Sequence, residues 1–289
     1  MNRYYVLLFF LASLTTVVYA TGARDSYDIY FTASLNGNLD GCYCIDNPAA
    51  GLVNTGTFLA SLTKKNTMLL DLGDRNGYPY DNKLAEYIDA AYKYLGYDIS
   101  LNGDQDFQEL IEDSSINWKN FPDNVILYNS TITVKQSPII IDGLMIISII
   151  DPNVFRFYSD DNQTKFHVAP PDEYLPGVLT AQDKRIVLLY HGYLDNLKKL
   201  LDLIGTEMIP IAFIGHEQSL IEGLVYGKTC IYSPGANGNN VGHIVINKNM
   251  QVIQYELLSF FHSDHDLEPV VSQLLKEYRE DTSKEKLIK

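Results

Sequence analysis

The sequence predicts an α/β fold in which two β-sheets pack face to face and helices cover their outer sides. Three observations predict it. Strand-like runs alternate with helix-like segments through the first half of the chain, which is the order of a layered α/β domain. Further strand-like runs and a hairpin signal follow in the second half, so a second sheet is expected. Neither an internal repeat nor a low-complexity linker interrupts the 289 residues, which favours one domain over residues 26–280.

The first half of the chain supplies three expected strands and two expected helices. Apolar residues recur with helical spacing over 51–62 and over 82–95, and Gly96 follows as the residue that ends the second helix. Short apolar runs bounded by turn residues are typical of strands. These strands are expected at Asp28–Ala33, Met68–Asp71 and Tyr97–Leu101.

The second half repeats this alternation less regularly. Residues 139–150 are typical of two strands joined by a hairpin turn at Asp142-Gly143, because Asp-Gly is a preferred two-residue turn. Helices are expected over 194–203 and from Glu268 onward. The remaining strands are expected at residues 125–127, 186–190, 211–214, 229–232 and 243–246.

The two ends of the chain are expected to lie outside the domain. Residues 1–20 combine a basic start at Arg3, an apolar run and a small final residue, Ala20, which is the pattern of a secretory signal peptide. An uncleaved anchor is the alternative, although the run is short for a membrane span. Residues 281–289 are mostly charged and are expected to form a frayed tail. We therefore expect a secreted or periplasmic protein without membrane attachment after signal cleavage.

The composition narrows the classes of partner. Lys and Arg number 22 against 36 Asp and Glu, which gives a formal net charge of −14. A nucleic acid or an anionic membrane requires clustered basic residues, so neither is expected as a partner. The molecule as a whole would repel an anionic substrate, so a phosphate site has to be local and metal-assisted.

Three cysteines, Cys42, Cys44 and Cys230, occur in a chain that is expected to enter a compartment permitting disulfides. A bond between Cys42 and Cys44 would close a very small, strained ring. We therefore expect one of these two residues to pair with Cys230, which leaves one free thiol. The alternative is that all three are unpaired.

Polar side chains follow five of the expected strands at the point where each strand ends. This edge of an α/β sheet usually forms the site. The run Asp71-Leu-Gly-Asp74 shows the pattern, because its glycine lets the backbone turn so that Asp71 stays near the strand while Asp74 points into a cleft. The other loops contain Ser34 and Asn36, Asp104 to Asp106, His191, and His216 to Gln218.

The order and spacing of these loops resemble the calcineurin-like metallophosphoesterases, and more closely the N-terminal domain of secreted 5′-nucleotidases and UDP-sugar hydrolases. The resemblance extends over the mature chain to about Tyr278, and it includes Ala90–Asp98 and Tyr232–Gly242. It implies a four-layer α/β/β/α metallophosphoesterase sandwich. The separate nucleotide-recognising C-terminal domain of those enzymes is expected to be absent.

In that family the five motifs supply the ligands of two metal ions, and this chain matches one of the two sets. Asp74 matches the bridging aspartate, Asp104 replaces an asparagine, and His191 and His216 match two histidines of the same site. The resemblance therefore implies that these four residues bind one divalent transition metal ion, which could be Zn, Mn or Fe.

The other set has lost its ligands. Ser34 replaces an aspartate, and Asn36 and Gln218 each replace a histidine, so the second ion is expected to be missing. Gln105 stands where the family has a histidine that assists the leaving group, and an amide cannot donate a proton as an acid. Asn36 and Gln105 are expected instead to position a phosphate through hydrogen bonds.

These replacements predict a 5′-nucleotidase-like protein with one metal site and weak or lost hydrolase activity on a phosphorylated small molecule. A lone ion can still polarise a phosphoryl oxygen and acidify water, although the clamp of two ions is lost. The alternative is a non-catalytic pseudoenzyme that uses the cleft to bind a ligand or a partner.

Two further features have competing interpretations. The loop with Cys42 and Cys44 overhangs the cleft in this family, so a thiolate there could replace a lost ligand or form a redox-responsive cap. A pair that only steadies the loop is the simpler interpretation. The segment His262–Asp266 has metal-like spacing but lies outside the family motifs, and it is interpreted as a solvated linker.

Overall fold

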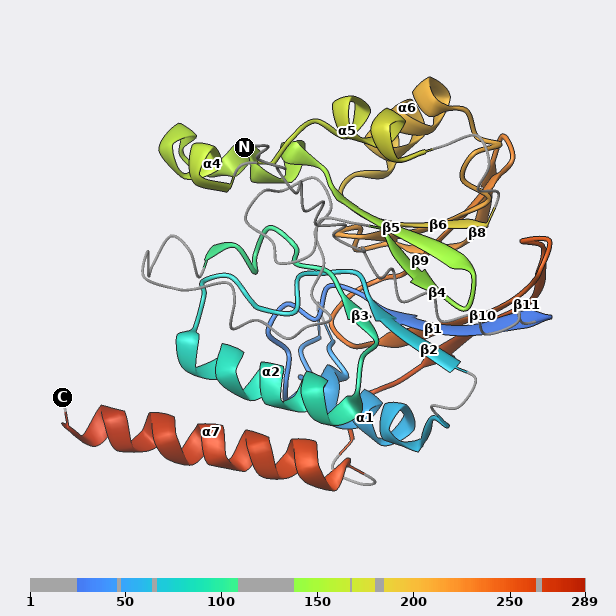
Figure 1. The fold of residues 1–289 in the computed structure, drawn as a ribbon. Coiled ribbons are helices and arrows are strands. Elements are labelled where there is room, and N and C mark those ends of the chain that lie inside the picture. The colour runs from blue at the N-terminus through green and yellow to red at the C-terminus, as the bar shows by residue number, and fades with distance from the viewer. Residues whose placement is uncertain are drawn as a thin grey trace, which may run out of the picture.

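The computed structural model describes residues 25–45, 48–63, 67–108, 138–166, 168–179, 185–263 and 267–288. Within these residues, two sheets pack against each other and helices cover the outer face of each sheet (Figure 1). The predicted order of layers is therefore confirmed. The expected signal peptide and the expected strand at 125–127 lie outside the described residues. None of the described helices combines the length and the apolar character needed to cross a membrane.

The first sheet is built around β1 (Ser26–Thr32). On one side β1 pairs in parallel with β2 (Thr67–Asp71), which pairs in parallel with the short β3 (Ile99–Ser100). On the other side β10 (Asn240–Asn247) runs antiparallel to β1, and β11 (Val252–Ser259) runs antiparallel to β10. The three parallel strands therefore end at one common edge, where their following loops meet.

The second sheet has six strands in the order β4-β5-β6-β7-β9-β8. Its four central strands run parallel, while β4 and β8 are antiparallel edge strands. Every residue of β6 and β7 is buried, as expected for parallel strands covered on both faces. The strands span Ile139–Ile141 (β4), Leu144–Ile150 (β5), Ile186–His191 (β6), Ile211–Gly215 (β7), Leu220–Tyr226 (β8) and Thr229–Pro234 (β9).

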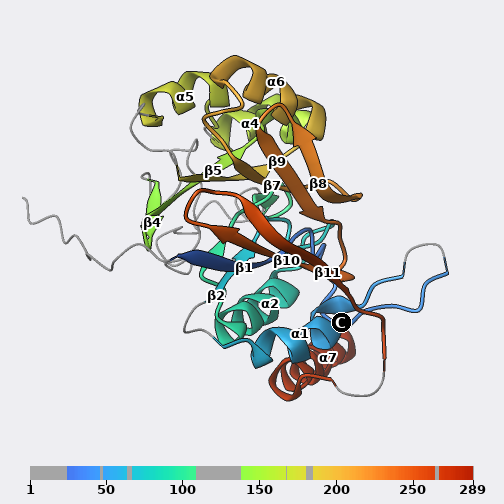
Figure 2. The same cartoon turned by 90° about the vertical axis from the view of Figure 1, so that its right-hand side faces the viewer.

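The main core lies between the two sheets, where the rings of Phe31 from β1 and Phe213 from β7 lie 4.5 Å apart between centroids. Two further apolar layers pack the helices onto the outer faces, one set on each sheet (Figure 2). The first sheet carries α1 (Gly51–Ser61), α2 (Asn82–Leu95) and α7 (Pro269–Ile288). The second carries α5 (Pro171–Val178) and α6 (Leu194–Ile204), with the short helices η2 (Pro152–Phe157) and α4 (Asp160–Phe166) between β5 and α5.

Two local predictions are confirmed with their physical cause. α2 begins after Asp81, whose carboxylate accepts a hydrogen bond from the Leu84 amide at 3.0 Å, and it ends at Gly96 in the left-handed conformation (φ 69°). The turn between β4 and β5 places Asp142 at φ 50° and Gly143 at φ 82°, which is the left-handed pair that a two-residue hairpin requires.

Several elements were not expected from the sequence. These are β8, β11, η2, α4 and α5, and β3 is shorter than the run Tyr97–Leu101 indicated. The final helix, α7, continues to Ile288 and so includes most of residues 281–289, for which we expected a tail.

The cysteine pairing that we expected is wrong. Cys42 and Cys44 are bonded to each other, with their Cα atoms 5.3 Å apart, a normal separation for a disulfide. Cys230 carries a free thiol on β9, and its side chain packs against the core between the sheets. The expected pairing failed because Cys230 is committed to that packing, while the loop brings Cys42 and Cys44 close enough to pair.

Candidate metal centre

Two aspartates and two histidines from four loops converge between the sheets. Asp74 follows β2 and Asp104 follows β3 in the first sheet, while His191 ends β6 and His216 follows β7 in the second. Each offers one ligand atom, and these four atoms all lie within 4.8 Å of one another. The fold thus brings together the four residues that the resemblance implied for one metal ion. Among the described residues, no other group of three or more His, Cys, Asp or Glu has this geometry.

Each imidazole faces both carboxylates. The Nε2 atom of His191 lies 3.4 Å from Oδ2 of Asp74 and 3.3 Å from Oδ1 of Asp104. The Nδ1 atom of His216 lies 3.4 Å and 3.0 Å from the same two oxygens. All four atoms therefore point to one common region, which is the arrangement of ligands around a single ion.

The backbone between the end of β2 and Asp74 fixes the orientation of His191. Its Nδ1 atom lies 2.7 Å from the carbonyl oxygen of Leu72, and the ring is fully buried. A carbonyl can only accept, so Nδ1 carries the proton and donates it. In this tautomer Nε2 points its lone pair into the space that it shares with the two aspartates, where a metal ion would accept it.

Two atoms of the cluster lack the hydrogen bonds that buried polar atoms normally make. Oδ1 of Asp74 accepts a hydrogen bond from the Gln105 amide at 3.1 Å. Oδ2 of Asp74 and Nδ1 of His216 are buried, yet neither has a hydrogen-bond partner of normal geometry among the described residues. Such atoms are costly unless something else satisfies them. The donor set of two carboxylates and two imidazoles therefore fits a divalent transition metal ion.

The electrostatics of the cluster are those of a cation site. Burial opposes ionisation of Asp74, but His191 and His216 outweigh it and lower the pKa of that carboxyl. Burial also works against a charged His216, yet its contacts with Asp104 and Asp74 raise its pKa to about 9. The buried carboxylates thus favour positive charge in the space between the four ligands, which a metal ion would supply in place of ring protons.

The loops that carry the cluster hold strained backbone. Ser34, Asn36, Asp74 and His216 all have positive φ values, of 47°, 54°, 58° and 69°. Non-glycine residues rarely adopt this conformation, and where they do it often belongs to a functional site. Ser34 and Asn36 therefore share the strained backbone conformation of Asp74 and His216, although they do not belong to the cluster of four ligands.

Asp106 holds these loops together and was not singled out from the sequence. Its buried carboxylate accepts hydrogen bonds from the backbone amides of Asp74, Asn76 and Gly103 at 2.8 to 3.0 Å. This ties the loop after β2 to the loop after β3. Asp71 stays at the end of its strand as expected, where Thr32, Tyr92 and Ser100 surround its carboxylate.

Of the three residues that we expected at a second metal position, Asn36 takes part in a network of neutral hydrogen bonds, whereas Ser34 and Gln218 do not. Asn36 accepts a hydrogen bond from Nε2 of Gln105 and donates one to Asn237, each at 2.9 Å, and Asn38 donates to the same oxygen of Asn237 at 3.0 Å. Ser34 is fully buried, and its hydroxyl has no hydrogen-bond partner among the described residues. Gln218 is exposed.

Asn237 and Asn38 were also not singled out from the sequence. The signal that could have found Asn237 is its place within Tyr232–Gly242, one of the segments that carries the resemblance. Of the segment 262–266, only His262 and Ser263 are described, and the His262 ring packs against Tyr43. The paired Cys42 and Cys44 have no thiolate to offer a metal.

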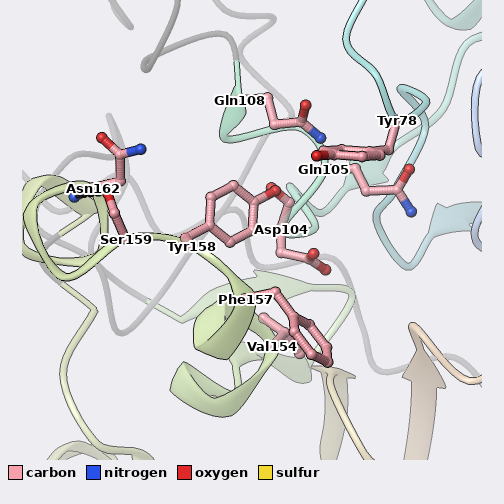
Figure 3. A pocket seen from close by; sticks show the side chains of 9 residues that line it. All are labelled: Tyr78, Asp104, Gln105, Gln108, Val154, Phe157, Tyr158, Ser159 and Asn162. Carbon is pink, nitrogen blue, oxygen red and sulfur yellow. Dashed lines mark hydrogen bonds between the residues drawn. The ribbon is translucent and has the colours of Figure 1, made fainter.

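A cavity of about 600 Å³ opens beside the cluster (Figure 3). It shares Asp104 with the cluster, and the neighbouring Gln105 also lines it. The other lining residues come from the segment after Asp74, from Gln108 and from η2 with the residues that follow it. They are Tyr78, Gln108, Val154, Phe157, Tyr158, Ser159 and Asn162.

Comparisons with known proteins establish the fold. No family model matches the sequence. No curated protein matches it either. Solved structures do match. A 5′-nucleotidase precursor from Thermus thermophilus is 13% identical over 89% of this chain and 59% of that chain, with a TM-score of 0.65. The sulfate thiohydrolase SoxB of the same species is 13% identical over 89% of this chain and 60% of that chain, with a TM-score of 0.69. The calcineurin-like phosphoesterase YfkN from Bacillus subtilis matches at 15% identity over 89% of this chain and 97% of that chain, with a TM-score of 0.55.

This chain thus spans about three fifths of the length of the nucleotidase and of SoxB. At these identities the likeness concerns the fold, which is that of the calcineurin-like phosphoesterases and of the 5′-nucleotidases. The fold resemblance inferred from the sequence motifs is confirmed.

Proposed function

We propose that this chain binds one divalent transition metal ion through Asp74, Asp104, His191 and His216, and that it slowly hydrolyses a phosphoric monoester of a small molecule. The observation that carries the proposal is the convergence of four ligand atoms within 4.8 Å, two of them buried without hydrogen bonds, on the fold of metal-dependent phosphoesterases. When bound, the ion supplies Lewis-acid polarisation of a phosphoryl oxygen and activation of water.

The chain's own residues would orient the phosphate. Gln105 lines the cavity next to Asp104, and one N–H of its carboxamide donates to Asn36. A carboxamide carries two N–H groups, so Gln105 keeps a second donor for a phosphoryl oxygen. Asn36 holds Gln105 in place through that bond, and Asn237 holds Asn36 in turn.

The same geometry limits the rate. The second site holds carboxamides and a hydroxyl where an ion would need carboxylates and imidazoles, so only one ion would stabilise the charge of the transition state. Gln105 cannot donate a proton to the leaving group, which removes a contribution of about 10²- to 10⁴-fold. Turnover is therefore expected to favour esters with a leaving group that departs without protonation.

A second candidate function is a non-catalytic module that binds a phosphorylated ligand in a metal-dependent way. The neutral network of Asn36, Gln105 and Asn237 favours it, because a set of bonded amides is suited to holding a phosphate but not to transferring a proton. The proposed secretion through residues 1–20 applies to both functions, and N-terminal sequencing of the exported protein tests it by a start at Thr21.

The deciding experiment measures metal content and hydrolysis together. The parent protein is expected to contain about one equivalent of Zn, Mn or Fe by mass spectrometry, and a variant with Asp74→Ala and His191→Ala is expected to contain none. A matched control changes Asp28→Ala and His243→Ala, because these residues form a His–Asp pair of 2.6 Å outside the cluster. This control is expected to keep its metal.

Hydrolysis of p-nitrophenyl phosphate then separates the two functions. Activity that rises with metal occupancy, persists in the control and disappears in the double variant supports the hydrolase. Full metal occupancy without any turnover, but with phosphate-analogue binding, favours the binding module. A parent protein that takes up no metal under any loading condition would rule out both.

A further inference from the structure

The cavity beside the metal cluster has a composition that selects its ligand. Asp104 is the only residue with a carboxyl group among its described lining residues, and they include neither Lys nor Arg. The carboxylate of Asp104 faces the two histidines through its Oδ1 atom. A leaving group with a negative charge of its own would therefore find no cationic side chain among these described lining residues, which favours an uncharged group.

Two aromatic rings at the cavity are unusually exposed. The side chains of Tyr78 and Phe157 are 78% and 81% exposed, respectively. In the view of Figure 3 they lie on opposite sides of the Asp104 carboxylate. Large apolar side chains exposed at a pocket often contact ligand, and a flat ring placed between them would remove their faces from water.

Phe157 is held in place by a chain of ring contacts that leads to the metal cluster. The guanidinium carbon of Arg156 lies 4.7 Å from the Phe157 ring centroid and 4.8 Å from that of Tyr193. The ring of Tyr193 meets the ring of His216 edge-on at 4.8 Å. Phe157 is thus pre-organised relative to a metal ligand, which lowers the entropy cost of binding a ring against it.

Gln108 adds a polar requirement. Its side chain is 6% exposed, it lines the cavity, and its Nε2 atom has no hydrogen-bond partner of normal geometry among the described residues. It lies close enough to the Tyr158 hydroxyl to offset part of the rise in pKa that burial causes in that phenol. A carboxamide carries two N–H groups, so beside its contact with Tyr158 the Gln108 side chain keeps at least one for an acceptor atom on a ligand.

We infer that this cavity binds the leaving group of the substrate, and that this group is a flat, uncharged aromatic ring held between Tyr78 and Phe157, with an acceptor substituent facing Gln108. This inference rests on the proposed function, because it assigns the phosphoryl group to the metal cluster and the ring to the cavity. It narrows the substrate to aryl phosphoric monoesters, because a phenolate departs without protonation far more readily than an alkoxide does.

The test compares two ligands that cannot be hydrolysed. Binding of methylphosphonate and of 4-nitrobenzylphosphonate to the metal-loaded protein is measured by calorimetry. The benzyl ligand is expected to bind at least about tenfold more tightly, from ring stacking and apolar burial. Phe157→Ala is expected to remove most of this advantage while methylphosphonate binds as before. Phe261→Ala is the matched control, because Phe261 is 79% exposed but lies outside the cavity.

The outcomes separate the inference from the proposed function. Equal affinity for the two phosphonates, or an advantage that survives both Phe157→Ala and Tyr78→Ala, overturns the inference and leaves the metal site standing. If neither phosphonate binds in a metal-dependent way, the proposed function fails. The cavity is then tested with 4-nitrobenzyl alcohol by ligand-detected NMR, where binding that Phe157→Ala does not weaken contradicts the ring site.

Discussion

Gln105 donates a hydrogen bond of 2.9 Å from its side-chain nitrogen to the side-chain oxygen of Asn36. This bond joins the loop after β3 to the loop after β1, at two positions where a charged or ionisable side chain was expected from the family pattern. The side-chain nitrogen of Asn36 in turn donates a hydrogen bond to the side-chain oxygen of Asn237. These amide side chains carry no charge, so the two loops are joined through neutral groups beside the cluster.

The first prediction concerns metal stoichiometry. Asn36→Ala is expected to leave about one equivalent of metal bound, because Asn36 contributes no ligand to the cluster. The free energy of unfolding should fall by about 1 to 2 kcal/mol, since Gln105 and Asn237 each lose a partner. Mass spectrometry and urea unfolding check the two parts. Two equivalents in the parent, or loss of metal in the variant, would contradict the neutral network.

The second prediction concerns Gly103, which lets the loop after β3 approach the cluster. A Cβ atom at this position would collide with Oδ1 of Asp74 and with Cε1 of His191. Gly103→Ala is therefore expected to lower metal content and to destabilise the protein by about 1 to 3 kcal/mol, as overpacking does.

Gly56→Ala is the control for Gly103→Ala. Gly56 lies inside α1, where the added methyl would meet its nearest neighbour, Cβ of Glu268, at 3.3 Å. The gain in helix propensity of about 1 kcal/mol offsets this mild crowding. Metal content should be unchanged in the control. Equal metal content in the two variants would show that the close approach of Gly103 is not needed.

The third prediction concerns the disulfide. Digestion without reductant should give a single peptide that contains both Cys42 and Cys44 with an internal bond, and Cys230 should be alkylated as the only free thiol. Because the bond closes only a very short loop, changing both residues to Ser should cost less than about 2 kcal/mol of stability and leave metal binding unchanged. A peptide cross-linked to Cys230 would refute the pairing.

The parts of the fold that the sequence predicted are those where local chemistry and burial agree. α2 combines an aspartate cap, an apolar face and a terminal glycine, so its limits could be placed. The limits of β8 and β11 could not be placed, because these edge strands contain no fully buried residue and are held mainly by pairing with β9 and β10. Whether these two segments form strands depends on pairing with a neighbouring strand, and a local sequence pattern does not reveal that pairing.

The same distinction applies to the site. His191 ends the buried strand β6 and His216 directly follows the buried strand β7, so their position at one edge of the sheet could be anticipated from strand order. The bond between Asn36 and Asn237 spans 201 residues, and amides have no spacing rule that would connect them. The expected cysteine pairing was wrong for a related reason. It rested on the small size of the Cys42–Cys44 ring, whereas the packing of Cys230 against the core depends on residues distant in the sequence.

The last prediction concerns Asp71, which lies behind the cluster without belonging to it. Burial and the nearby Asp106 raise the pKa of the Asp71 carboxyl from 3.8 to about 7, although Thr32 and the Gly73 amide donate to it. The folded protein therefore holds a proton on Asp71 that the unfolded chain releases near pH 4. Between about pH 4 and pH 7 the folded state binds more protons than the unfolded state. The free energy of unfolding therefore falls as pH rises through this range, and it levels off above about pH 7, where Asp71 is ionised in both states.

Asp71→Asn removes this titration while keeping the shape of the side chain. The amide oxygen can accept from Gly73, and the amide nitrogen can donate to Thr32 and Tyr92, whose hydroxyls can also accept. When the pH is raised from 5 to 8, the unfolding free energy of the parent should fall by about 3 kcal/mol relative to that of the variant. The reason is that about two pH units of this interval, from 5 to 7, lie below the raised pKa of Asp71, and each unit corresponds to about 1.4 kcal/mol. Urea unfolding at both pH values measures it. A difference between parent and variant that stays constant with pH would mean that Asp71 is ionised throughout, and that its surrounding hydroxyls stabilise the charge more than burial opposes it.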